Sequence, residues 1–179
     1  MIDLTDDRVA VGALIEESLA SFASEHPRTA WSTFALYACP WSGWIMSCFD
    51  TDANSRARVA GLVSDGLNWF GEDDRGRYNN SCPDFAFVEW RSLDLPHWQA
   101  AYEAETPLRI RDLSGTLHRL GEDDEAFNGV TFDFLASMLR GAGIPAPTGN
   151  RAHLRTCRLG VMLLDSAHKT FWSLPNPQN

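Results

Sequence analysis

The chain has 179 residues, of which 44% are apolar and 22% charged, a composition typical of a folded globular protein rather than a disordered or fibrous one. Its 24 acidic residues outnumber its 15 Lys and Arg residues, and the net charge of -9 repels phosphate backbones and anionic lipid headgroups. Nucleic acid and membranes are therefore not the expected partners, and since no signal peptide or stretch of about 20 apolar residues is present, we expect a cytoplasmic protein.

A helix and a hairpin are predicted at the start of the chain. Apolar residues at three-and-four spacing predict an amphipathic helix over 6–25, which ends before Pro27 because proline cannot continue the helical hydrogen bonds. Aromatic and small residues over 31–37 predict a strand, and the apolar run 44–49 predicts a second one. The turn residues 40–43 join these strands into an antiparallel hairpin.

The middle of the chain predicts two helices with a strand between them. Apolar spacing predicts an amphipathic helix over 53–70, and the polar, glycine-containing stretch 71–80 reads as a loop. Closely spaced aromatic and apolar residues over 83–90 predict a strand. Pro96 is suited to the first position of a helix, which we expect to continue over 97–105.

The remaining segments complete the predicted fold. Leucine and isoleucine spacing predicts a helix over 106–120, and a further helix follows over 125–140. The apolar runs 158–164 and 170–174 predict a closing hairpin. Helices and hairpins are interspersed without a linker, so we predict a single α+β domain over 1–179. Its mainly antiparallel sheet of hairpins would pack against several amphipathic helices.

Two arrangements of residues could support catalysis. Asp94 and His97 are three residues apart at a helix start, where the carboxylate could orient the imidazole as a general base or metal ligand. Cys82 could act as a nucleophile if His97 or His118 reached it in space. The structural alternatives are stronger: Asp94 has a capping role available, and a partly buried Cys is usually inert.

No motif predicts a metal or a cofactor. The four cysteines are scattered, without a C-x-x-C pair or the histidine spacing of a zinc site. The glycine patterns of dinucleotide sites, P-loops and the α/β-hydrolase elbow are also missing. We therefore assign no catalytic, cofactor-binding or metal-binding residues.

Two acidic runs are the clearest candidates for a surface with a function. Neither 72–74 nor 122–125 has the ligand spacing of a calcium loop, so each is either a solvated segment or a face for a basic partner. Trp rings are usually packed in the core, but exposed ones form binding hot spots. The partner-binding residues predicted on this basis are Glu72, Asp73, Asp74, Tyr78, Trp98, Glu122, Asp123 and Asp124.

Several segments also carry a resemblance to a known family. They are Phe34-Ala35-Leu36-Tyr37, Phe49-Asp50-Thr51, the stretch 85–90 running into Leu95-Pro96-His97-Trp98, Ala101-Tyr102-Glu103 and Leu174-Pro175-Asn176-Pro177. Together they resemble a bacterial family of uncharacterised proteins, catalogued as a domain of unknown function, some of whose members lie near polymorphic toxin genes. The resemblance implies an immunity protein. It supplies no catalytic residues.

Three hypotheses follow. The leading one is a non-enzymatic bacterial protein that binds another protein and neutralises a basic toxin domain. The second is a small hydrolase or transferase that uses Cys82, His97 or another His. The third is a scaffold or oligomer-forming protein, which solution mass measurements would distinguish; the sequence does not predict the oligomeric state.

Overall fold

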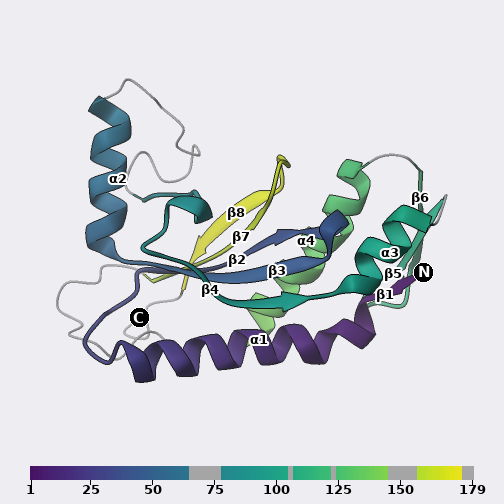
Figure 1. The fold of residues 1–179 in the computed structure, drawn as a ribbon, viewed down its shortest axis with the longest axis horizontal. Coiled ribbons are helices and arrows are strands. Elements are labelled where there is room, and N and C mark those ends of the chain that lie inside the picture. Colours follow the sequence, from purple (N-terminus) through teal and green to yellow (C-terminus); the bar gives the residue numbers. More distant parts are fainter. Residues whose placement is uncertain (65–77, 105–106, 122–123, 145–156, 175–179) are drawn as a thin grey trace.

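The computed structural model describes residues 1–64, 78–104, 107–121, 124–144 and 157–174. Within these ranges the chain forms four α-helices, two short 3-10 helices and two β-sheets (Figure 1). In chain order the elements are β1 (Ile2–Asp3), α1 (Leu4–Glu25), β2 (Thr33–Cys39), η1 (Pro40–Ser42), β3 (Trp44–Asp50), α2 (Asp52–Ser64), η2 (Cys82–Asp84), β4 (Phe87–Asp94), α3 (Pro96–Ala104), β5 (Leu108–Arg111), β6 (Leu117–Leu120), α4 (Asp124–Gly141), β7 (Arg158–Leu163) and β8 (Lys169–Ser173).

The larger sheet has five strands in the order β4-β3-β2-β7-β8. Both predicted hairpins are present in it, β2 with β3 and β7 with β8, and each is antiparallel. The two hairpins join through a parallel pairing of β2 with β7, so that the yellow strand β7 lies beside the blue strand β2 in Figure 1. The smaller sheet pairs β5 with β1 in parallel and with β6 antiparallel. The α+β fold with mainly antiparallel strands is confirmed.

The prediction of a helix over 106–120 is wrong, because β5 and β6 in this segment form an antiparallel hairpin. Leu108 and Ile110 are buried and alternate with exposed Arg109 and Arg111, which is the two-residue period of a strand. The turn between the strands contains Gly115 with φ 85°, a backbone conformation that ends any helix.

Other predicted boundaries shift by a few residues. The strand expected over 83–90 begins at Phe87, because a 3-10 turn containing Pro83 precedes it, and it continues to Asp94. The helix at Pro96 begins at that residue as predicted. The second predicted helix is described as far as Ser64, and its last positions lie outside the described residues.

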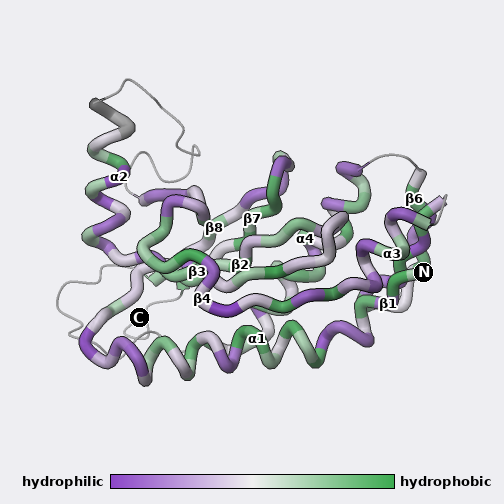
Figure 2. The backbone as a smooth tube through the Cα atoms, in the orientation of Figure 1, coloured by the Kyte–Doolittle hydropathy of each residue, from purple (hydrophilic) through white to green (hydrophobic). Residues whose placement is uncertain are grey.

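The main core lies between one face of the five-stranded sheet and the helices α1 and α4. Helix α1 packs against β3 and β4, α4 packs against β7, and the two helices contact each other. Phe22 of α1 stacks on Phe49 of β3 with 4.1 Å between ring centroids, and Trp90 of β4 packs edge-on to the same Phe22 ring at 5.3 Å. Figure 2 shows hydrophobic and hydrophilic residues alternating along α1, as expected of a helix with one buried face.

The opposite face of this sheet, which we call the second face, carries a separate apolar cluster. The buried members of this second-face cluster are Ala35, Tyr37, Cys48, Cys82 and Phe85, and its partly buried members are Trp44, Met46, Met162, Leu164 and Phe171. Within the described residues, the cluster includes no side chain from any of the four α-helices. One face of the sheet is therefore covered by helices, whereas the second face keeps part of its apolar surface accessible.

Candidate functional site

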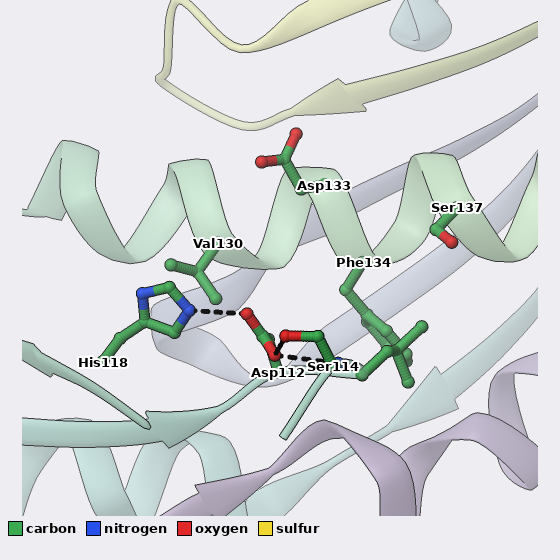
Figure 3. Close-up of a pocket in the computed structure, with 8 residues that line it drawn as sticks. Asp112, Ser114, His118, Val130, Asp133, Phe134 and Ser137 are labelled. Carbon is green, nitrogen blue, oxygen red and sulfur yellow. Dashed lines mark hydrogen bonds and ion pairs between the residues drawn. The ribbon is translucent and has the colours of Figure 1, made fainter. Parts of the chain in front are cut away.

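A groove of about 210 Å³ lies between the β5–β6 turn and α4 (Figure 3). Its lining consists of the turn residues Asp112, Leu113 and Ser114, the β6 residue His118, and the α4 residues Val130, Asp133, Phe134 and Ser137. The four α4 residues recur at three-and-four spacing, which places them on one side of that helix. The groove is thus formed by a helix face and a polar turn.

Asp112 organises the polar end of the groove. Its Oδ1 accepts hydrogen bonds from the backbone N–H of Ser114 at 2.8 Å and of Thr116 at 3.0 Å, and from Ser114 Oγ at 2.6 Å. Its Oδ2 lies 2.8 Å from His118 Nε2. The Ser114 hydroxyl and then the His118 ring hold the pKa of the Asp112 carboxyl well below its usual range.

These contacts do not make a nucleophile. Ser114 and His118 both turn toward Asp112 in Figure 3, and the other contact of the Ser114 hydroxyl is with Thr116 Oγ1 at 2.8 Å. A serine nucleophile needs a histidine nitrogen beside its own hydroxyl, with the acid on the opposite ring nitrogen. The polar groups of the β5–β6 turn and His118 instead bond to one another and stabilise the turn.

A second contact of serine, histidine and carboxylate occurs at the β7–β8 turn. Ser166 Oγ lies 3.0 Å from His168 Nδ1, and Glu125 Oε2 lies 2.8 Å from the same nitrogen. Because both partners use one ring nitrogen, the imidazole cannot pass a proton from the serine while the acid orients it. This cluster joins the start of α4 to the turn and carries no catalytic arrangement.

Neither of the two residue pairs that could support catalysis, Asp94 with His97 or Cys82 with a histidine, is formed. His97 Nε2 lies 3.0 Å from Asp7 Oδ1 of α1, whereas Asp94 ends β4. Cys82 is fully buried on the second face, in the same apolar cluster as Cys48. His97 and His118 are therefore engaged by carboxylates rather than by Cys82.

Trp98, which was predicted to bind a partner, is buried in this structure. Its side chain has an exposed fraction of 0%, and its Nε1 donates a hydrogen bond of 2.7 Å to Asp7 Oδ2. The apolar face of α3 is packed on the core between Phe127 and Phe134 of α4. The sequence around Pro96 predicts that Trp98 lies at the start of a helix. It does not predict which side of that helix packs against the core.

The other predicted partner-binding residues divide into two groups. Tyr78 is half-buried, with the guanidinium of Arg158 4.6 Å from its ring centroid, and Asp124 is exposed at the start of α4, where it accepts a 2.7 Å hydrogen bond from Tyr102. That bond is the main reason for the raised pKa of the Tyr102 hydroxyl. Five predicted residues lie outside the described ranges: Glu72, Asp73, Asp74, Glu122 and Asp123.

Sequence reasoning missed a buried polar row at one end of the second face. The strand register places Thr33 of β2 directly between Asp50 of β3 and Arg158 of β7. All three are buried, with exposed fractions of 0%, 0% and 1% respectively. The guanidinium of Arg158 lies between the rings of Tyr78 and Phe171, and its Nη1 donates to Asn80 Oδ1 at 2.9 Å.

Asp50 is the unusual member of this row. Its Oδ1 accepts hydrogen bonds from Asn54 Nδ2 at 2.7 Å and from the backbone N–H of Ala86 at 3.2 Å. Its Oδ2 and Thr33 Oγ1 are both buried without a hydrogen-bond partner. Burial raises the pKa of the Asp50 carboxyl, although its hydrogen bonds oppose that effect.

Replacing Asp50 with asparagine is expected to stabilise the protein by about 1 kcal/mol at pH 7, because it removes a buried charge and keeps the accepting oxygen. The advantage should shrink as the pH falls. Because its pKa is raised, the Asp50 carboxyl of the folded protein binds a proton at a higher pH than the carboxyl of the unfolded chain does. As the pH falls through the folded-state pKa, the free energy of unfolding of the wild type therefore rises relative to that of the variant. Urea unfolding at neutral and acidic pH measures both effects.

Glu17→Gln is the matched control for this substitution, because it removes the same charge from an exposed position of α1. It should change the free energy of unfolding by less than about 0.5 kcal/mol. A clear loss of stability in Asp50→Asn at neutral pH would contradict the burial argument.

Comparison with family models, with curated proteins and with solved structures finds no match in any of the three. Within the described residues, no three or more His, Cys, Asp or Glu side chains gather closely enough to hold a metal ion. No helix in those ranges combines the length and apolar character that crossing a membrane requires.

Proposed function

We propose that this chain is a bacterial protein-binding protein that neutralises a basic toxin domain, and that it binds its partner through the second face of the five-stranded sheet. The accessible apolar surface of that face is the observation that carries the proposal. The family resemblance in the sequence points in the same direction.

The side chains on this face have the character of an interface core. Trp44 and Met46 of β3, Met162 of β7 and Leu164 just after β7 are each partly exposed in one cluster. Tyr37 of β2 lies beneath them and packs against Trp44 with 5.4 Å between ring centroids. Aromatic residues and methionine are enriched at protein interfaces, so these partly exposed side chains are suited to contact with a partner.

The charges around the face favour a basic partner. Glu89 and Asp94 of β4 and Asp165 of the β7–β8 turn are exposed at its edges, with Lys169 as a basic neighbour. Asp165 lies close enough to contribute, after burial and Cys82, to the raised pKa of the Tyr37 hydroxyl. Together with the net charge of -9, this edge attracts a positively charged surface and speeds its encounter.

The described chemistry gives more support to binding than to catalysis. In both contacts of serine, histidine and carboxylate the histidine is not placed to activate the serine. The histidines that could pair with Cys82 or Asp94 contact other carboxylates instead. The residues named for a hydrolase or transferase therefore stabilise turns and helix contacts.

The proposal is tested with the purified products of the genes that neighbour this one. One of them should bind the chain with a 1:1 stoichiometry in calorimetry, with an affinity that falls as salt is added, and the chain should suppress its toxicity on co-expression. If no neighbouring product binds, the proposal fails. If the chain itself forms a dimer that buries the second face, the scaffold hypothesis replaces it.

Met162→Glu is expected to weaken that binding by about 100-fold or more, because it places a charge at the centre of the apolar cluster. The control is Val9→Glu, since Val9 is 79% exposed on α1, away from the second face. Val9→Glu should leave the affinity unchanged, and circular dichroism should show both variants folded. Equal affinities for the two variants would place the interface elsewhere.

A further inference from the structure

The two end strands of the five-stranded sheet differ in how well they are protected. β4 forms one end, and its pairing with β3 is interrupted by a register shift near Glu89, which has φ 52°. Ser21 of α1 also bonds to the side chains of Trp90 and Arg91 on this strand. Bulges and covering elements are the usual protection of an edge strand. β8 forms the other end, and its pairing with β7 continues without a shift over the whole strand.

The hydrogen bonds of β8 show which of its backbone groups face outward. The Leu163 N–H donates a hydrogen bond to the His168 carbonyl just before β8, in the same register as the strand itself. In an antiparallel pair, only every second residue bonds to the neighbouring strand. Since His168 bonds to the β7 side, the N–H and C=O groups of Lys169, Phe171 and Ser173 point away from β7.

These outward groups form an open edge. Within the part of the chain that the structure describes, nothing bonds to the outward N–H and C=O groups of β8. No residue of β8 is buried, whereas every residue of β2 in the middle of the sheet is. Figure 1 shows β8 in yellow at the margin of the sheet, beyond β7. A row of unpaired donors and acceptors is a template for a further strand.

We propose that β8 pairs antiparallel with β8 of a second copy of this chain, about a two-fold axis at Phe171, and so joins two five-stranded sheets into one. The proposal goes beyond the binding of a toxin and does not depend on it. It rests on the open edge and on the match of this strand with itself.

Pairing about Phe171 matches every outward group of the strand. Lys169 lies opposite Ser173 of the second copy, and Phe171 lies opposite the same residue, so each outward N–H meets an outward C=O. On the side of the second face, the two Phe171 rings become neighbours. On the other side, Thr170 lies opposite Trp172 of the second copy. Aromatic pairs and pairs of an aromatic with a β-branched residue are among the favoured cross-strand contacts.

The charge of β8 favours a second copy as the occupant of this edge. Two chains with a net charge of -9 repel each other over most of their surface. β8 carries Lys169 and no acidic residue, and the two-fold pairing places serine rather than a like charge opposite that lysine. β4 at the other end of the sheet contains Glu89 and Asp94. Repulsion between copies is therefore weaker along β8.

The proposed dimer leaves the second face of each copy uncovered, because the strands meet edge to edge. Phe171 belongs to the second-face cluster, so the clusters of the two copies meet at the axis. Each copy can then bind one toxin domain, and the ratio of one to one is unchanged. Dimerisation and toxin binding are consequently measured, and fail, independently.

Sedimentation equilibrium of the full chain alone tests the proposal. It should show a monomer–dimer equilibrium with a dissociation constant on the order of 10–100 μM, because a single pair of strands buries a small area. The amide hydrogens of Lys169, Phe171 and Ser173 should exchange with solvent more slowly as the protein concentration rises. A monomer at about 1 mM overturns the proposal, as does a dimer in which these amides exchange at the monomer rate. Protection of these amides only by a bound toxin domain overturns it too, in favour of a strand added by that partner.

Variants at Ser173, which is exposed, give a second readout. Ser173→Lys places like charges opposite each other at both symmetric positions and should weaken dimerisation by about tenfold, whereas Ser173→Glu pairs with Lys169 and should strengthen it. Ser24→Lys is the matched control, because it adds the same charge at an exposed position of α1. It should leave the dissociation constant unchanged.

A charge exchange completes the series. Lys169→Glu combined with Ser173→Lys restores opposite charges across the axis and should return the dissociation constant to near the wild-type value. Equal constants for Ser173→Lys and Ser173→Glu would overturn the proposed register. Hydrogen exchange of the wild-type chain decides the question even where a variant fails to fold.

Discussion

Replacing Gly43 with alanine should lower the free energy of unfolding by about 3 kcal/mol, because two independent costs coincide at this position. Gly43 has φ 67°, which disfavours any side chain. A Cβ there would lie 2.3 Å from the Leu95 carbonyl oxygen and 3.1 Å from its carbon. These are backbone atoms, which cannot swing aside as the end of a flexible side chain could.

The close approach at Gly43 joins two parts of the fold. Its carbonyl accepts a 2.6 Å hydrogen bond from the Leu95 N–H, at the junction of β4 with α3. An alanine would therefore push the β2–β3 hairpin away from that junction and move Trp44, the first residue of β3, on the second face. The substitution should affect partner binding as well as stability.

Urea unfolding compares Gly43→Ala with Gly61→Ala as its control. A Cβ at Gly61 meets no heavy atom within 4 Å and the residue lies inside α2, so alanine there should be neutral or stabilising by up to about 1 kcal/mol. If Gly43→Ala stays within about 1 kcal/mol of the wild type, the backbone contact is not the constraint that we describe.

Trp98→Ala should cost about 3–5 kcal/mol, because a large ring is removed from a fully buried site. The ring lies 6.4 Å from Phe127 and 6.3 Å from Phe134, measured between centroids. Its loss also removes the indole donor from Asp7, whose exposed fraction is 4%, and leaves that carboxylate with His97. Thermal and urea unfolding should both show the change.

Trp98→Phe separates the two contributions. It keeps most of the apolar volume and removes the hydrogen bond to Asp7, so its cost should be about 1–3 kcal/mol. If Trp98 were exposed at the surface, either substitution would lower the free energy of unfolding by less than about 0.5 kcal/mol. Small effects in both would restore Trp98 as a candidate contact residue.

The hairpins were the most predictable part of the fold. In 31–49 two apolar runs flank turn residues that include a proline and a glycine, and the pairing of β2 with β3 follows from this local pattern. The run 158–164 and its turn predict the β7–β8 hairpin by the same reasoning. Local chemistry is sufficient where the two strands are neighbours in the sequence.

The segment 106–120 shows where such reasoning fails. Its leucines and isoleucine at 108, 110, 113, 117 and 120 fit a helical stripe, and leucine favours helices. The alternation with arginine extends over only four residues in β5, which is too short to outweigh the longer pattern. The strand forms because β5 finds a parallel partner in β1 near the start of the chain.

The candidate sites depend on contacts that no local pattern contains. The polar row requires β2 to lie between β3 and β7, and the second-face cluster gathers side chains from β2, β3, β7 and β8. In the sequence, Asp50 follows the predicted strand 44–49 and precedes the predicted helix 53–70, and nothing in this position indicates burial. Its burial follows from the tertiary structure alone, as does that of Trp98.

The parallel pairing of β2 with β7 also sets the order in which the protein can be completed. During synthesis the β2–β3 hairpin leaves the ribosome long before residues 158–163, which pair with 33–38. Until then the nascent chain presents an unpaired edge of β2 with buried-type side chains on both faces, a template for association with other chains. The five-stranded sheet therefore closes only once β7 has been synthesised, and until then this edge is what a chaperone would need to shield.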